Sequence, residues 1–298
     1  MPDLTRLKAA LLANRPDPEL PIDELRATMR AAAEAFPVPA GVVVEPVDAG
    51  GVPAESVAPA EGQVRRTVLY LHGGGYCTGS ASSVRGLAGH LALAGSARVV
   101  ALDYRLAPEH PFPAGRDDAL AAYRWLLDGG TDPARLAIGG DSAGGGLTVS
   151  TLVALRDAGT PLPAAGFGIS PWLDLRLGNE SLLSLAERDP IVTPRLLERF
   201  TDYYIHGSSP NDPGVSPAVA ELAGLPRLLI QVGEDECLLD DATAFGARAT
   251  EAGVPTTLEV WPDMVHVWHL LAPRLEQANQ AIARIGQWLA EDGSGGHD

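Results

Sequence analysis

The pattern of hydrophobic positions alternates along most of this chain between two kinds of segment. Short runs rich in valine and leucine are separated by longer stretches with apolar residues at helical spacing. Such alternation predicts βα units and a mostly parallel sheet that helices cover on both faces, which is the α/β class. The expected strands are residues 41–50, 52–58, 67–71, 98–102, 136–139, 166–170, 228–232 and 257–261, and the expected helices are residues 83–94, 115–127, 143–156, 241–251 and 274–290.

Two segments depart from this alternation. Residues 3–36 have the pattern of two helices, one on either side of a proline-rich break at 15–18, and residues 178–210 form an insertion with a helical stretch at 194–204. Because open α/β sheets bind ligands at the carboxyl ends of their strands, we expect both segments to form a helical cap over that edge. The predicted division is an N-terminal cap segment at 1–40 and an α/β domain at 41–298, with the cap insertion at about 178–210.

The charge of the chain limits its partners. There are 38 acidic and 22 basic residues, a formal net charge of −16, and no basic patch with interleaved aromatic residues. Such a chain repels phosphate backbones and anionic membranes, so we expect no nucleic-acid and no membrane partner. No run approaches the roughly 20 apolar residues that cross a bilayer. The first residues carry Asp3, Arg6 and Lys8 without a sustained apolar stretch, which predicts a cytoplasmic protein rather than a secreted one.

The two cysteines, Cys77 and Cys237, lie far apart in the sequence. Two distant thiols form neither a disulfide framework nor a zinc site. The chain also has no His-Glu-x-x-His, no paired Cys-x-x-Cys and no calcium-binding loop. We therefore expect no metal.

A serine stands between a predicted strand and a predicted helix in the segment Gly140-Asp141-Ser142-Ala143-Gly144. Gly-x-Ser-x-Gly alone is a weak motif, but this strand–turn–helix context is that of a nucleophile elbow. Glycines at both flanks leave room for the strained turn. The turn places the Ser142 hydroxyl at a helix N-terminus, where backbone N–H groups stabilise negative charge. The alternative is an ordinary glycine-rich turn in which Ser142 caps the helix.

An earlier strand ends in a glycine loop, His72-Gly73-Gly74-Gly75. Successive glycines let the backbone approach a ligand closely, because no Cβ obstructs it. A phosphate cradle would use the same property, but no Lys-Ser/Thr pair follows here. The loop and the serine turn together predict an oxyanion hole made by the backbone N–H groups of Gly73, Gly74 and Gly75 with Ala143. The sequence leaves open which two glycines donate, and we favour Gly74 with one neighbour.

With two further segments, these motifs resemble the hormone-sensitive-lipase-like branch of bacterial carboxylesterases. The further segments are residues 103–114, Asp-Tyr-Arg-Leu-Ala-Pro-Glu-His-Pro-Phe-Pro-Ala, and Ser170-Pro171-Trp172-Leu173-Asp174. The resemblance extends from about residue 67 to residue 268. It implies an α/β-hydrolase core, a helical cap built partly from the N-terminus, no cofactor, and a preference for short acyl chains.

A histidine must follow the serine, because this fold places its triad in the order Ser, acid, His. Four histidines follow Ser142. His206 falls in the expected cap, His297 in the C-terminal tail, and His269 is expected on a helix or at the surface. His266 follows the last strand closely and matches the position of the family's histidine, so it is the predicted base.

The acid is expected in the loop after the strand at 228–232, which reads Gly-Glu-Asp-Glu-Cys-Leu-Leu-Asp from Gly233 to Asp240. The family commonly has Asp-Pro-Leu-x-Asp here, with its first Asp catalytic. Alignment on Leu238 and Asp240 places Glu236 at that position without a gap, whereas alignment on Gly233 favours Asp235. We predict Glu236, with Asp235 as the alternative.

These residues predict a serine carboxylesterase that hydrolyses short-chain esters through an acyl-enzyme. Ser142 attacks, His266 takes its proton and Glu236 orients the imidazole. A lactone hydrolase or a deacetylase would use the same residues. A ligand receptor on a disabled hydrolase is a more distant alternative, because such receptors lack the catalytic histidine. The expected partner is a small ester, and a homodimer through the sheet edge is a further expectation from the resemblance.

Overall fold

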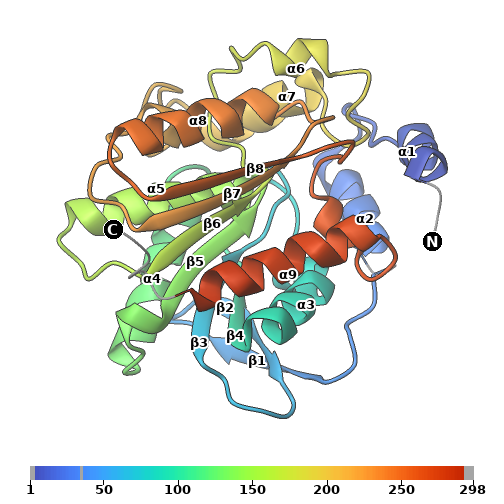
Figure 1. Ribbon diagram of the computed structural model, residues 1–298. Helices are drawn as coiled ribbons and strands as arrows, with labels where there is room; N and C mark the ends of the chain where they lie inside the picture. The colour runs from blue at the N-terminus through green and yellow to red at the C-terminus, as the bar shows by residue number, and fades with distance from the viewer. Residues whose placement is uncertain (1–3, 34–35, 292–298) are drawn as a thin grey trace.

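The computed structural model describes residues 4–33 and 36–291, and these form an eight-stranded sheet (Figure 1). The strands are β1 (Val42–Asp48), β2 (Pro53–Pro59), β3 (Arg66–Leu71), β4 (Ala97–Leu102), β5 (Leu136–Asp141), β6 (Ala165–Ile169), β7 (Arg227–Gly233) and β8 (Thr256–Trp261). They lie in the order β1-β2-β4-β3-β5-β6-β7-β8. The pairs β1–β2 and β2–β4 are antiparallel and all other neighbours are parallel. This order brings the carboxyl ends of β3, β5 and β7 to one edge.

Helices cover both faces of the sheet (Figure 1). On one face, α3 (Arg85–Gly95) and α9 (Glu276–Ala290) pack against each other and share a buried apolar cluster with the sheet. A second apolar cluster lies on the other face, beneath α4 (Ala114–Asp128), α5 (Ala143–Asp157) and α8 (Leu239–Glu251). Strands buried on both faces need apolar side chains throughout, which explains the continuous apolar runs of the sequence. The predicted α/β-hydrolase fold is confirmed.

The two segments outside the alternation contain the expected helices. These are α1 (Leu4–Ala13) and α2 (Ile22–Ala33) before the sheet, and α6 (Ser181–Ser184) and α7 (Pro194–Ile205) in the insertion. The segments contact each other, since the Arg199 guanidinium donates hydrogen bonds of 2.6 Å to the carbonyls of Pro18 and Leu20. Arg195 also forms an ion pair of 2.7 Å with Glu19. The assignment of both segments to one cap remains a prediction.

Some boundaries differ from those expected. Helix α8 begins at Leu239, two positions early. The buried Asp241 does not cap it, since its carboxylate accepts the backbone N–H groups of Leu173 and Asp174. Strand β6 ends before Ser170, which has a positive φ of 47°. Single turns of 3₁₀ helix also occur at η1 (Ala81–Val84), η2 (Pro133–Arg135), η3 (Pro217–Val219) and η4 (Trp268–Leu271).

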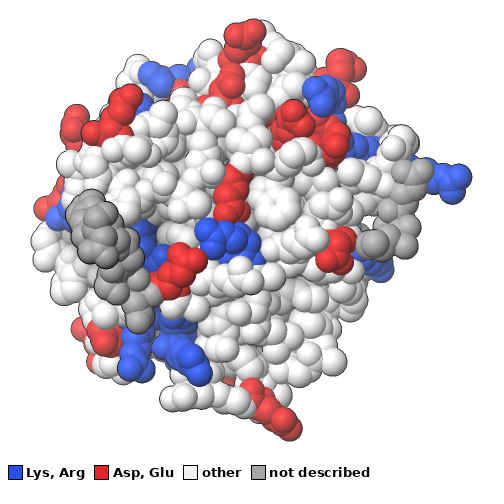
Figure 2. All heavy atoms as spheres, in the orientation of Figure 1, with Lys and Arg blue, Asp and Glu red and all other residues white. Residues whose placement is uncertain are grey.

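Charged side chains of both signs are interspersed on the face of the molecule that Figure 2 shows, without a continuous basic patch there. Among the residues that the structure describes, no helix is both long and apolar enough to cross a bilayer.

Candidate active site

Ser142 occupies a strained turn between β5 and α5. Its φ of 53° and ψ of −121° lie outside the regions that L-residues prefer, and its side chain makes no hydrogen bond to the helix that follows. Glycine is required on both sides, because a Cβ on Gly140 or on Gly144 would overlap with the carbonyl oxygen of Leu71. The strand–turn–helix geometry is therefore that of a nucleophile elbow, and Ser142 does not act as a helix cap.

His266 lies beside Ser142. Its Nε2 is 2.9 Å from Oγ of Ser142, and its Nδ1 is 2.9 Å from Oε2 of Glu236. The carboxylate requires a proton on Nδ1, so Nε2 is the unprotonated nitrogen and faces the Ser142 hydroxyl. The loops after β5, β7 and β8 thus bring these three predicted residues into one hydrogen-bonded chain, although 124 positions separate Ser142 from His266.

The other described histidines that follow Ser142 take no part in this chain of contacts. His269 is fully buried, against expectation, and its Nε2 lies 2.7 Å from Oε1 of Gln231 in the core. His206 is exposed at the end of α7, where it adopts a left-handed conformation. His297 lies outside the described residues.

Glu236 is held by more than the histidine. It is fully buried, and its Oε1 accepts hydrogen bonds from the Gly233 backbone N–H at 2.6 Å and from the Ser170 hydroxyl at 2.7 Å. The neighbouring Asp235 points elsewhere, and its carboxylate pairs with Lys8 and Arg188. The geometry thus brings Glu236, and not Asp235, to His266.

Ser170 is a member of this network that the sequence did not reveal. Its hydroxyl donates to Glu236 and accepts the backbone N–H of Val267 at 3.1 Å, so one side chain joins the loop of the acid to the loop of the histidine. Ser170 makes these contacts from a backbone conformation with a positive φ of 47°. The motif Ser-Pro-Trp marked the segment, but only the fold shows what Ser170 contacts.

The buried charges around His266 raise the pKa of its imidazole. Burial by itself lowers the pKa of His266, but the hydrogen bond and charge of Glu236, together with the charges of Asp189 and Asp141, raise it above the usual 6.5. Asp141, next to Ser142, is also buried. Burial raises its pKa to about 6, against the opposing effect of a 2.8 Å hydrogen bond from the Tyr70 hydroxyl.

The glycine loop packs tightly around the serine turn. A Cβ on Gly73 would overlap with the Asp141 carboxylate, and a Cβ on Gly75 would overlap with the ring of Phe200 on α7. The Gly73 backbone interacts with Asp141 and lowers the pKa of that carboxyl. Within residues 4–33 and 36–291, the amides of Gly74, Gly75 and Ala143 donate no hydrogen bond to the protein. They are therefore free to bind an oxygen of the substrate.

A cavity of about 1040 Å³ opens onto this site. Gly73, Gly74 and His266 line it, and the N-terminal segment contributes Leu11, Leu20 and Met29 to the lining. Its size is that of a small-molecule site.

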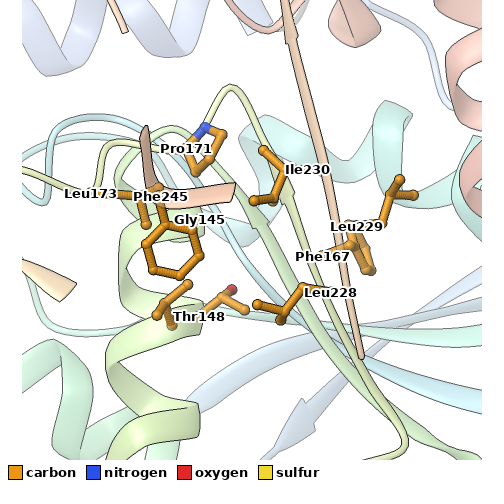
Figure 3. A pocket seen from close by; sticks show the side chains of 11 residues that line it. Gly145, Thr148, Phe167, Pro171, Leu173, Leu228, Leu229, Ile230 and Phe245 are labelled. Carbon is orange, nitrogen blue, oxygen red and sulfur yellow. The ribbon is translucent and has the colours of Figure 1, made fainter. Parts of the chain in front are cut away.

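A much smaller void of about 10 Å³ lies behind α5, among Pro171, Ile230 and Phe245 (Figure 3). Its lining is apolar, and it has room for at most one water molecule. It is therefore a packing defect of the core rather than a ligand site. Among the described residues, no group of three or more His, Cys, Asp or Glu side chains is arranged to hold a metal ion.

Known proteins have similar sequences and the same fold. Residues 68–270 match the family model described as alpha/beta hydrolase fold. An acetyl-hydrolase of Streptomyces hygroscopicus is 49% identical over 252 residues, covering 85% of this chain and 83% of that protein. A crystal structure of an esterase from the bacterial hormone-sensitive lipase family is 45% identical with a TM-score of 0.94, covering 98% of this chain and 100% of the other.

A crystal structure of the protein EstE5, soaked with p-nitrophenyl butyrate, is 44% identical with a TM-score of 0.94, covering 98% of this chain and 99% of the other. These likenesses extend over nearly the whole chain at high identity, well beyond a shared fold. The chain belongs to the hormone-sensitive-lipase family of bacterial α/β hydrolases and is a carboxylic ester hydrolase.

Proposed function

We propose that this enzyme hydrolyses short-chain carboxylic esters through a covalent acyl-enzyme, with Ser142 as nucleophile, His266 as general base and Glu236 as the acid that orients it. The hydrogen-bonded chain Ser142–His266–Glu236, in which His266 lines the large cavity, is the observation that carries this proposal. Each link is 2.9 Å long, within hydrogen-bond reach, and the link between Ser142 and His266 is the one along which a proton moves.

The reaction follows from these contacts. Ser142 Oγ attacks the ester carbonyl as its proton passes to Nε2 of His266, and the Glu236 carboxylate stabilises the imidazolium that forms. The oxyanion accepts hydrogen bonds from the amide of Ala143 and from Gly74 and Gly75, because Gly73 is engaged with Asp141. His266 then protonates the leaving alcohol. Water, deprotonated by His266, attacks the acyl-enzyme, and His266 returns that proton to Oγ of Ser142 as the carboxylic acid leaves.

Aromatic side chains packed beside the glycine loop support a preference for short acyl groups. The Phe200 ring closes against Gly75, and behind it Tyr76 stacks on Tyr204 with ring centroids 3.9 Å apart. A long chain directed past the glycine loop would meet this wall. The relative named acetyl-hydrolase and the p-nitrophenyl butyrate used with EstE5 agree with a small acyl group.

Hydrolysis of p-nitrophenyl acetate, butyrate and decanoate by the purified enzyme tests this proposal. We expect kcat/KM for the decanoate to be at least about tenfold below that for the better of the two short esters, since misplacing a substrate by about 1 Å is already costly. The same assay with Ser142→Ala gives the background. A higher kcat/KM for the decanoate would contradict the short-chain preference, and turnover of lactones or acetylated amines alone would move the substrate to those classes.

The pH dependence of kcat/KM is expected to show an acid limb above the usual histidine pKa of 6.5. Only neutral His266 can accept the serine proton, and its surroundings raise its pKa, so activity rises as pH increases through that raised value. The measurement is kcat/KM for p-nitrophenyl butyrate between about pH 5 and pH 9, followed at the isosbestic wavelength of p-nitrophenol. An acid limb centred below the usual value would contradict the assignment of His266 as a base paired with Glu236.

A further inference from the structure

The residue that precedes the proposed acid is bound by the N-terminal helix. Asp235 is almost fully buried, and its Oδ2 lies 2.5 Å from Nζ of Lys8 on α1. Its other oxygen pairs with Arg188 of the insertion. The two cations come from the two segments that lie outside the α/β core, 227 and 47 positions away in the sequence. Asp235 is thus the point at which both segments meet the loop of the acid.

Lys8 also reaches the loop of the histidine. Its Nζ lies 3.9 Å from Oδ1 of Asp263, three positions before His266, and the backbone N–H of Asp235 donates a 3.0 Å hydrogen bond to Met264 in that same loop. One ammonium group therefore contacts the loops that carry both Glu236 and His266. A change in the position of the Lys8 ammonium would therefore alter the contacts of both loops.

The residue that follows the acid is held from the same direction. The backbone N–H of Cys237 donates a 2.9 Å hydrogen bond to the fully buried carboxylate of Asp189 in the insertion. Arg15 of the N-terminal segment donates to the backbone carbonyls of Asp189 and, at 3.0 Å, of Ala186. Glu236 therefore lies between two residues that are both held by segments outside the core.

We propose that the ion pairs of Lys8 and Arg188 with Asp235 position Glu236 against His266, so that α1 helps to align the reacting groups as well as covering the cavity. This inference rests on the proposed role of Glu236. A surface ion pair contributes little, but the Asp235 side chain is only 7% exposed, and a buried carboxylate that loses its partner moves toward water. Such a movement of the loop shifts Glu236, and misplacement of about 1 Å is enough to slow the reaction strongly.

The first test removes the Lys8 charge. Lys8→Met is expected to lower kcat for p-nitrophenyl butyrate about tenfold with KM changed by less than about twofold, because the loop geometry serves the transition state more than ground-state binding. Lys8→Arg, which keeps the cation, is expected to restore most of the loss. Arg188→Met should act in the same direction but less, because that side chain is 54% exposed. Arg195→Met is the matched control, since it breaks an ion pair with Glu19 away from the acid loop.

The second test uses the fact that Lys8 is the only lysine of the chain. Acetylation removes the charge of its side chain, whereas reductive methylation retains it. In the folded wild-type enzyme we expect acetylation to lower kcat as Lys8→Met does, and methylation to leave it nearly unchanged. The Lys8→Arg protein, treated in the same way, controls for modification of the N-terminal amine. Both modifications are therefore compared in the wild-type fold, and Lys8→Arg serves only as the control for the N-terminal amine.

The outcomes separate this inference from the function on which it rests. Full activity in Lys8→Met and in acetylated enzyme, with Glu236→Gln inactive, would overturn the positioning role and leave the triad intact. Equal losses in Lys8→Met and in Arg195→Met would also overturn it, because the effect would then belong to the cap in general. If Glu236→Gln keeps wild-type kcat, the proposed acid itself is wrong and the inference falls with it.

Discussion

Replacing Ser142 by alanine is expected to lower kcat for p-nitrophenyl butyrate by roughly 10⁵-fold or more, the scale of the loss when a serine hydrolase loses its nucleophile. Among the described residues, the Ser142 hydroxyl is the group that lies within hydrogen-bond distance of Nε2 of His266, at 2.9 Å. No other nucleophile is therefore placed to receive the acyl group with His266 as its base. KM for p-nitrophenyl butyrate should change little. The measurement is steady-state hydrolysis with background subtraction.

The stability of this variant should match that of the wild type. Alanine meets the same backbone strain as serine at φ 53°, and the lost hydroxyl makes no cap hydrogen bond to α5. Ser184→Ala, which changes an exposed serine on α6, is the control and should keep full activity. A fluorophosphonate ester should label wild-type enzyme once, at Ser142, and fail to label the alanine variant. Residual activity above about 1% of wild type, or labelling at another residue, would contradict the nucleophile assignment.

The alternation of apolar runs was sufficient to predict the sheet and its helices, because strands buried on both faces are mostly apolar. Boundaries were less predictable where distant contacts decide them. Asp241 appeared to begin α8, but its carboxylate is used by Leu173 and Asp174, 68 and 67 positions earlier. Ser170 shows the same limit, since it acts through contacts with residues 66 and 97 positions away.

In the candidate site, too, some residues could be predicted from local sequence and others depend on distant contacts. Ser142 and the glycine loop were recognisable because the strained elbow and the close approach of backbones permit only small residues at fixed spacing. The choice between Asp235 and Glu236 was open, since adjacent carboxylates in one loop differ only in the direction of their side chains. Asp235 points to Lys8, whose position beside the acid loop no local pattern indicates, whereas Glu236 is held by Ser170, Gly233 and His266.

Glu236→Gln is expected to lower kcat by about 10⁴-fold, which is the loss that follows when the acid of a serine triad is made neutral. Glutamine keeps the length of the side chain, and its amide oxygen can still accept from Ser170 and from the Gly233 backbone. Its amide group, however, can donate to Nδ1 of His266. That donation stabilises the tautomer with the proton on Nε2, which cannot accept the proton of Ser142.

Asp235→Asn is the matched comparison, because it neutralises the adjacent carboxylate in the same loop. Its loss should be about tenfold, since it acts only through the position of Glu236. The pH profile separates the two roles further. The hydrogen bond and charge of Glu236 raise the pKa of His266, so residual activity of Glu236→Gln should have its acid limb at lower pH than the wild type. If instead Asp235→Asn shows the larger loss and the displaced acid limb, the triad acid is Asp235, and the contact between Glu236 and His266 is structural.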